Sequence, residues 1–285
     1  MAAAAVRPAA VAGTFYPGSP GVLRAAVEGY LAEGRAGLAG REAARDARAS
    51  PAARSPKAVI APHAGYVYSG PTAGYAFAAL TAGGPALRRI VLLGPAHRVW
   101  LRGLGLPGAE GFATPLGVVP VDDAAVEAVA DLPQVSVQPL AHAPEHSLEV
   151  ELPFLQVAQE GVAIVPLVVG EASGEEVAEV LERLWGGPET AIVVSSDLSH
   201  FLPYDKARQV DRDTADEILA LRGPLHPRQA CGALAVNGLL TAARRLGLVA
   251  ELLDLRSSGD TAGDHDQVVG YGAFAFHEED GSASR

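Results

Sequence analysis

Short runs of β-branched and other apolar residues alternate with longer stretches of helical periodicity along this chain. Each run is too short for a helix and suits a strand that is buried on both faces. The predicted strands are 57–61, 89–94, 163–170, 191–196 and 268–274. The predicted helices are 22–31, 72–80, 124–130, 148–158, 177–184, 210–221 and 234–246. The alternation predicts an α/β fold with a largely parallel or mixed central sheet between helices.

The composition narrows the classes of function. The chain is 49% hydrophobic over 285 residues, which is ample for a buried core and excludes a disordered protein. Its formal charge of −11 disfavours a nucleic-acid partner, because proteins that bind phosphate backbones present positive charge. A single cysteine excludes a disulfide framework and suits a reducing compartment. Since the sequence shows neither a signal peptide nor an apolar run of roughly 18 residues, we expect a cytoplasmic protein with no membrane partner.

We expect a single α/β domain over residues 1–285 with two irregular regions. Residues 35–57 carry six basic residues against two acidic ones and lack apolar periodicity, which predicts a flexible insertion. A basic recognition arm is the alternative interpretation of this stretch, although it has no aromatic residues to accompany its charge. The polar tail after His277 is expected to fray.

Three histidines come directly after predicted strands. His63 closes the segment VIAPH, His97 closes LLGPAH and His200 closes VSSDLSH. Ligands of open α/β sheets bind outside the carboxyl ends of the strands, so these side chains can converge on one pocket. Pro62 and Pro95 stiffen the first two strand exits. Because neutral imidazole is the commonest protein ligand of divalent first-row metals, His63 and His97 are predicted to bind a metal.

The spacing leaves the third metal ligand open. The candidates are Asp197, His200, His146, Glu149 and Cys231. Cys231 lies near the start of a predicted helix, where the helix dipole lowers the pKa of a thiol, although a free cysteine is as often a small buried hydrophobic residue. His146 and Glu149 lie three residues apart on one face of a predicted helix, where Glu149 could instead serve as a cap. Asp197 could equally cap the turn that follows it.

Other catalytic patterns are missing from the sequence. It contains no GxxxxGK[ST] phosphate loop, no GxGxxG that opens a helix, no HExxH and no GxSxG. A cysteine nucleophile paired with a histidine remains an alternative enzyme class. The remaining histidines are expected to be solvated surface residues: His142, His226, His265 and His277.

Seven sequence blocks resemble the Memo family, the B component of the AmmeMemoRadiSam system. In chain order they are RPAAVAGTFYPGSPGVL, APHAGYVYSGPTAGYAF, VLLGPAHRVW, PEHSLEVELPFLQ, VVSSDLSHFLPYDKA, QACGALA and SSGDTAGDHDQVVGYGAFAF. Together they span about Arg7 to Phe276. The family has the fold of the class III extradiol ring-cleaving dioxygenases, so the resemblance implies an αββα-type sandwich with a pocket at the strand ends.

The resemblance also implies a metal site. Its implied metal ligands are His63, His97 and Cys231. Its implied pocket residues, our candidate catalytic residues, are His146, Asp197, His200 and Tyr68. The related dioxygenases use non-haem Fe(II), and a thiolate with two imidazoles suits Fe(II), Cu or Zn better than Mg or Ca. Fe(II) is therefore the expected cofactor, with Cu or Zn as alternatives.

The function that the resemblance implies is that of a metal-dependent redox or dioxygenase-like protein. Its ligand would be a small molecule or a peptide in the metal pocket. The alternative is a non-enzymatic module that binds a peptide or protein in a vestigial pocket of the same fold. Bacterial members of the family occur beside an AMMECR-type protein and a radical-SAM protein, which implies a functional association with both.

Overall fold

The computed structural model describes residues 6–44, 55–83 and 86–278. The helices are α1 (Pro20–Ala44), α2 (Tyr66–Leu80), α3 (Asp123–Glu127), α4 (Pro139–His142), α5 (Leu152–Ala158), α6 (Gly174–Arg183), α7 (Tyr204–Leu219) and α8 (Ala233–Leu246), with 3-10 turns η1 (Glu149–Glu151) and η2 (Ser258–Asp260). The strands are β1 (Val6–Arg7), β2 (Ala58–Ala61), β3 (Arg89–Pro95), β4 (Leu104–Leu106), β5 (Gly111–Thr114), β6 (Gly117–Pro120), β7 (Val135–Val137), β8 (Ala163–Val169), β9 (Thr190–Ser195), β10 (His200–Leu202), β11 (Leu248–Ser257) and β12 (Val268–Glu278).

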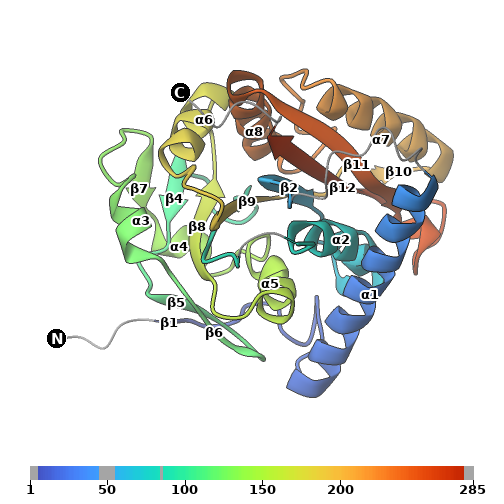
Figure 1. Ribbon diagram of the computed structural model, residues 1–285, viewed down its shortest axis with the longest axis horizontal. Coiled ribbons are helices and arrows are strands. Elements are labelled where there is room, and N and C mark those ends of the chain that lie inside the picture. The colour runs from blue at the N-terminus through green and yellow to red at the C-terminus, as the bar shows by residue number, and fades with distance from the viewer. Residues whose placement is uncertain (1–5, 45–54, 84–85, 279–285) are drawn as a thin grey trace.

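A nine-stranded mixed sheet forms the centre of the molecule (Figure 1). Its order is β10-β12-β2-β9-β3-β8-β4-β7, and β11 pairs with β12 outside this path. The central strands β2, β9, β3 and β8 are parallel, whereas β12 runs antiparallel to β2 and β4 antiparallel to β8. The expectation of an α/β fold with a mixed central sheet is therefore confirmed. A separate three-stranded sheet has the order β1-β5-β6.

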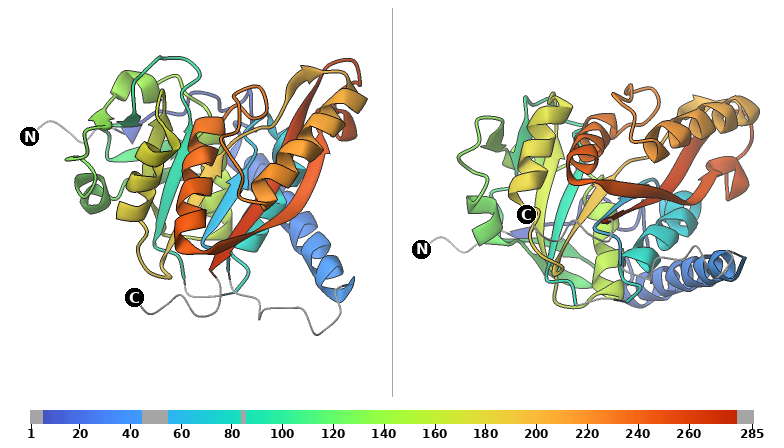
Figure 2. Two further views of the ribbon diagram at one scale, coloured as in Figure 1. Left: turned by 90° about the horizontal axis from the view of Figure 1, so that it is seen from above. Right: turned by 45° about the horizontal axis from the view of Figure 1, so that its top comes forward.

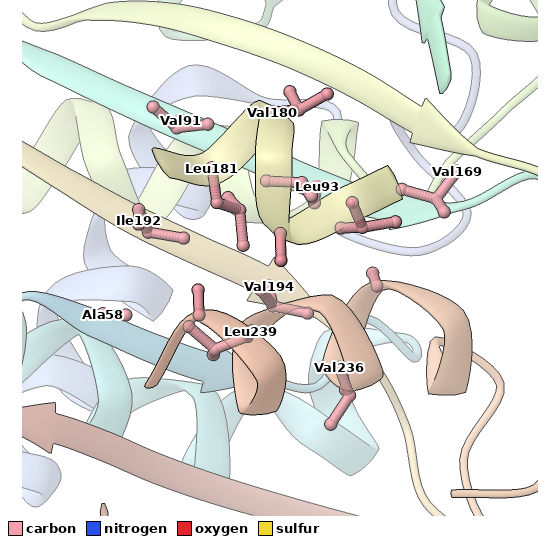
Figure 3. Packing of buried hydrophobic residues seen from close by; sticks show 14 of the residues in the cluster. Ala58, Val91, Leu93, Val169, Val180, Leu181, Ile192, Val194, Val236 and Leu239 are labelled. Atoms are coloured by element: carbon pink, nitrogen blue, oxygen red, sulfur yellow. The ribbon is translucent and has the colours of Figure 1, made fainter. Parts of the chain in front are cut away.

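Helices cover both faces of the large sheet, which explains why its central strands are apolar throughout. Alternate residues of each strand enter opposite cores: Val91 and Leu93 of β3 face α6 and α8, and Leu92 faces α1, α2 and α5. Figure 3 shows the first of these cores, where Val180 of α6 and Val236 of α8 lie over the strands. Figure 2 shows the layers from two other directions. Around the large sheet the described layers are thus helix, sheet and helix, and the αββα-type sandwich that the resemblance implied stays a prediction.

The predicted insertion over 35–57 is wrong for its first part, because α1 continues to Ala44. The continuation packs through glycine: a Cβ on Gly37 would overlap the Tyr75 ring of α2, as one on Gly34 just before it would overlap the Gly74 carbonyl. A helix face made of glycine and alanine gives no apolar periodicity, which is why the sequence did not show it. At the other end of the stretch, the buried Lys57 amine donates to the carbonyls of Gly187 at 2.9 Å and Thr190 at 2.8 Å.

The rest of the predicted insertion and the predicted frayed tail are not tested by the structure, whereas the predicted strands and helices are. Residues 45–54 of the predicted insertion and the tail beyond Glu278 lie outside the described residues, so those expectations stay predictions. The predicted strands and helices all correspond to elements of the structure, with ends that shift by several residues in α1, α2 and α7. The long strand β11 was not predicted. In the part of the chain that the structure covers, no helix has the length and apolarity needed to cross a membrane.

Candidate metal centre

The carboxyl ends of three neighbouring parallel strands place the first site residues. His63 comes two residues after β2, His97 two residues after β3, and Asp197 two residues after β9. Because β9 lies between β2 and β3 in the sheet, the three loops leave the same edge. Cys231 comes from another part of the chain and lies two residues before α8. The structure therefore brings side chains separated by up to 168 positions to one place.

The three implied metal ligands lie close enough to share one ion. One donor atom from each of His63, His97 and Cys231 falls within 4.8 Å of the other two. The His63 Nε2 atom is 3.4 Å from the Cys231 Sγ atom. Two further donor groups meet the same distance criterion and share residues with the first. They are His97, Glu145 and His146, and Asp197, His200 and Cys231.

Glu145 orients His97. One carboxylate oxygen accepts the backbone N–H of His97 at 2.6 Å, and the other lies 2.9 Å from the ring Nδ1. Burial opposes ionisation of this carboxyl, but the hydrogen bonds from the His97 side chain and from backbone N–H groups lower its pKa to about 2. An ionised Glu145 favours a proton on Nδ1 and leaves the Nε2 lone pair of His97 available, which is how ligand histidines are commonly held.

His63 is fixed from two sides and is almost fully buried, with 2% of its surface exposed. Its backbone N–H donates to the Asp197 carboxylate at 2.8 Å, and its Nδ1 lies 2.7 Å from the Ser195 hydroxyl oxygen. Burial, followed by the neighbouring rings of His97 and His146, lowers its pKa well below the usual value. A neutral imidazole results, as metal binding requires.

Cys231 approaches closely because the next residue is glycine. A Cβ on Gly232 would lie 2.7 Å from the Ser196 Cβ and 2.8 Å from the Ser195 carbonyl oxygen. The backbone N–H of Asp197 donates to the Cys231 Sγ atom at 3.3 Å. Burial and the Asp197 charge raise the thiol pKa, so the predicted lowering by the helix dipole is wrong for the thiol alone. A coordinated metal ion would deprotonate the thiol outright.

The four candidate catalytic residues surround these ligands. The His146 ring stacks on His97 with centroids 4.9 Å apart, and burial lowers the His146 pKa to about 4. Its Nδ1 lies 3.2 Å from Glu145 but is buried without a hydrogen-bond partner among the described residues. The His200 Nδ1 atom lies 2.9 Å from the Leu198 carbonyl oxygen. Burial raises the pKa of the Asp197 carboxyl, and Tyr68 is partly exposed.

A cavity of about 580 Å³ joins these residues. It is lined by six of the predicted site residues: His63, Tyr68, His97, His146, Asp197 and His200. Cys231 is not among its lining residues and contacts His63 and Asp197 instead. The cavity also has a wall that we did not predict, formed by Phe15 and by Tyr271 of β12. Tyr271 sits in an apolar strand pattern, so only the surrounding block GDHDQVVGYG could have drawn attention to it.

His142 is buried, with 2% of its surface exposed, so its assignment to the solvated surface is wrong. Its ring packs edge-on against Phe112, and Nε2 lies 2.7 Å from the Gly105 carbonyl oxygen. The arrangement could not be seen in the sequence, because Phe112 and Gly105 lie 30 or more positions away. His226 and His265 are exposed as expected, whereas His277 is half-buried.

We expect His142 to make the fold sensitive to acid. Burial lowers the His142 pKa to about 4, whereas the unfolded chain titrates near 6.5. The unfolded state therefore takes up the proton first, and stability is lost as the pH falls from about 6.5 to about 4, by up to about 3 kcal/mol. His142→Gln keeps an N–H donor for Gly105 and does not titrate. Urea unfolding at a series of pH values should show a flatter profile for this variant, and the exposed control His226→Gln should match the parent.

Comparison with known proteins agrees with the sequence blocks. A family model described as Memo-like protein matches residues 7–275. The chain belongs to the Memo family. A MEMO1 family protein of Archaeoglobus fulgidus is 35% identical over 283 residues, covering 93% of this chain and 97% of the relative. MEMO1 family proteins of Methanosarcina barkeri and Aquifex aeolicus are 36% and 33% identical, covering 94% and 95% of this chain and 98% and 99% of the relatives.

The donor set of this Memo-family protein fits a first-row transition metal. One ring nitrogen from each of two histidines and the sulfur of one cysteine converge, and each histidine has its Nδ1 atom engaged by a second residue. Soft thiolate with imidazole favours Fe, Cu or Zn and disfavours Mg and Ca, which prefer oxygen ligands. Glu145 and Ser195 supply the outer hydrogen bonds that metal-binding histidines normally have, and neither was singled out from the sequence.

Proposed function

We propose that this Memo-family protein binds Fe(II) through His63, His97 and Cys231 and carries out redox chemistry on a small molecule or peptide in the adjoining cavity. The main observation in support of this proposal is that the three donor atoms lie within 4.8 Å of one another, beside a cavity of about 580 Å³. Cu or Zn is the alternative metal. We also propose kinship in fold with the class III extradiol dioxygenases, which is supported by a pocket at the carboxyl ends of parallel strands.

Fe(II) would supply one-electron chemistry and a Lewis acid at the end of the cavity. The chain's own residues would bind the substrate and move protons. Asp197 is the first candidate for proton transfer, because it is 4% exposed and burial raises its pKa toward the neutral range. His200 and His146, which also line the cavity, are the other candidates. Phe15, Tyr68 and Tyr271 give the cavity an aromatic wall against which a flat or apolar substrate can pack.

The first test is the metal content of protein purified without added metal or chelator. We expect stoichiometric iron by elemental analysis, and an anomalous signal at the iron absorption edge of a crystal that lies between His63, His97 and Cys231. Asp197→Asn keeps the oxygen that accepts the His63 N–H, so iron should stay bound. Oxygen consumption with catechol as the probe substrate should fall by about 10²- to 10⁴-fold if Asp197 moves the proton.

The non-enzymatic alternative gives a different outcome. Protein free of metal that still binds a ligand in the cavity would favour a peptide- or protein-binding module. Two exposed aromatic side chains favour a macromolecular contact on this protein, Trp100 at 75% and Phe201 at 68% exposure. We further propose a cytoplasmic location, because of the single free cysteine, and an association with AMMECR-type and radical-SAM proteins, which rests on the family resemblance.

A further inference from the structure

Glu151 is a buried carboxyl group beneath the metal centre that the chemistry above does not use. It lies in η1 with none of its surface exposed. Its Oε1 atom is 2.7 Å from the Ser195 hydroxyl oxygen, and its Oε2 atom has no hydrogen-bond partner among the described residues. No described cation forms an ion pair with it. A buried carboxylate without a cation is costly, so its protonation state needs an explanation.

Glu149, two residues earlier, shows what a buried carboxylate in this protein looks like. It is also fully buried, but it pairs with Arg7 at 2.6 Å. It also accepts the Tyr16 hydroxyl at 2.6 Å and the backbone N–H groups of Ala10 and Val11. Both oxygens of Glu149 are therefore satisfied as an anion, whereas Glu151 has one contact and no positive charge beside it.

The contacts of Ser195 fix where the protons lie. Its hydroxyl oxygen is 2.7 Å from each of three atoms: the Ser147 carbonyl oxygen, Glu151 Oε1 and His63 Nδ1. A hydroxyl has one proton and two lone pairs. The Ser147 carbonyl can only accept, so a proton lies in this contact only if Ser195 donates it. The other two contacts then contain a proton only if Glu151 and His63 both donate to Ser195.

We propose that Glu151 is a neutral carboxylic acid that donates its proton to Ser195 and thereby positions the metal ligand His63. In this arrangement Ser195 donates to Ser147 and accepts from both Glu151 and the Nδ1–H of His63. The Nε2 lone pair of His63 is then directed toward Cys231, 3.4 Å away. Burial and the charge of Asp197 also raise the pKa of Glu151 well above its ordinary value, despite the Ser195 hydrogen bond, which agrees with the geometric assignment.

Loss of the Glu151 proton would disturb this arrangement. An ionised Glu151 would draw the Ser195 proton to itself, which would leave two oxygens facing each other at the Ser147 contact. Ser195 would then hold His63 less firmly, and the second ring tautomer would become accessible. Glu151 is thus a positioning residue, because it acts on the metal ligand through Ser195. Only the effect on metal affinity rests on the proposed iron site; the proton assignment does not.

The proton assignment can be tested on metal-free protein. At neutral pH the infrared spectrum should contain a carboxylic acid C=O band that shifts in D₂O and is missing from Glu151→Gln. Long-range ¹⁵N–¹H NMR should show His63 as the Nδ1–H tautomer in both proteins, since the glutamine amide also donates to Ser195. An unchanged infrared spectrum in the variant, or an Nε2–H tautomer in the parent, would overturn the assignment.

Metal affinity tests the positioning role. Glu151→Gln should bind Co(II), used as a probe, as tightly as the parent within about threefold. Ser195→Ala and Glu151→Leu should each bind it about 10- to 100-fold more weakly, as is typical when an outer hydrogen-bond partner of a ligand is removed. Equal loss in Glu151→Gln and Glu151→Leu would contradict the positioning role. If none of the proteins binds the probe while the infrared and NMR results hold, the proposed iron site fails and the proton assignment stands.

Discussion

Replacing Cys231 with alanine should abolish the proposed binding of iron while leaving the protein folded. The thiolate is the softest of the three implied ligands, and Fe(II) would retain only the two imidazoles of His63 and His97. Loss of a residue that only hydrogen-bonds to a metal ligand costs about 10- to 100-fold in metal affinity, so loss of a direct ligand should cost more than about 100-fold. Iron content after anaerobic loading and desalting measures the effect.

Cobalt substitution shows whether the thiolate itself binds the metal. The Co(II) form of the parent should have a thiolate-to-metal charge-transfer band, and Cys231→Ala should lack it. His226→Ala is the matched control, because His226 is an exposed histidine outside the site. Full iron content in Cys231→Ala would contradict the proposed ligand set. It would point instead to the overlapping group of His97, Glu145 and His146, which contains no cysteine.

The parts of the site that the sequence predicted depend on local patterns. Buried parallel strands are recognisable from their continuous apolar residues, and His63, His97 and Asp197 each follow such a strand within two residues. The rule that ligands bind at strand ends then brings the loops together without knowledge of the strand order. The residues alone left Cys231 as one of five candidates for the third ligand, and only the family resemblance selected it, because its segment lies far from the three strand ends in the sequence.

The parts that the sequence missed depend on contacts between distant residues. Ser195 meets Ser147 across 48 positions and Glu151 across 44, so neither hydroxyl nor carboxyl shows its role locally. The helix dipole gave the wrong direction for the Cys231 pKa because burial, a tertiary effect, outweighs it. The strand β11, LVAELLDLRS, lacks a regular alternation because its register shifts between Leu252 and Asp254, and it is defined instead by its long pairing with β12.

Arg7→Met should destabilise the whole protein by about 3–5 kcal/mol, the cost typical of removing one partner of a buried ion pair. Arg7 is 6% exposed and joins two separate segments. Its guanidinium pairs with Glu149 at 2.6 Å, donates to the His142 carbonyl at 2.8 Å and also donates to the Glu145 carbonyl. Methionine replaces the volume of the side chain but none of these donors, so it leaves Glu149 with an uncompensated charge. Urea unfolding at neutral pH measures the loss.

Two further variants separate the charge effect from other causes. Arg102→Ala breaks an ion pair with Glu176 at 2.7 Å in which the arginine is 60% exposed, and it should cost no more than about 1 kcal/mol. The double variant Arg7→Met with Glu149→Gln should recover part of the stability, because the buried charge is removed while an amide oxygen still accepts hydrogen bonds. A double variant less stable than Arg7→Met would contradict the charge explanation.

The ion pair between Arg7 and Glu149 explains why residues near the start of the described chain can line the cavity. Val6–Arg7 is a two-residue strand, too short to hold the segment by sheet pairing alone. Arg7 and the hydrogen bonds of Ala10 and Val11 to Glu149 attach the segment to η1 instead. That attachment places Phe15 against His146, with ring centroids 4.5 Å apart. In Arg7→Met, the segment that holds Phe15 against His146 should therefore become mobile more readily than the central sheet. Hydrogen exchange of the backbone amides of residues 10–16 should rise more than that of β2 and β9.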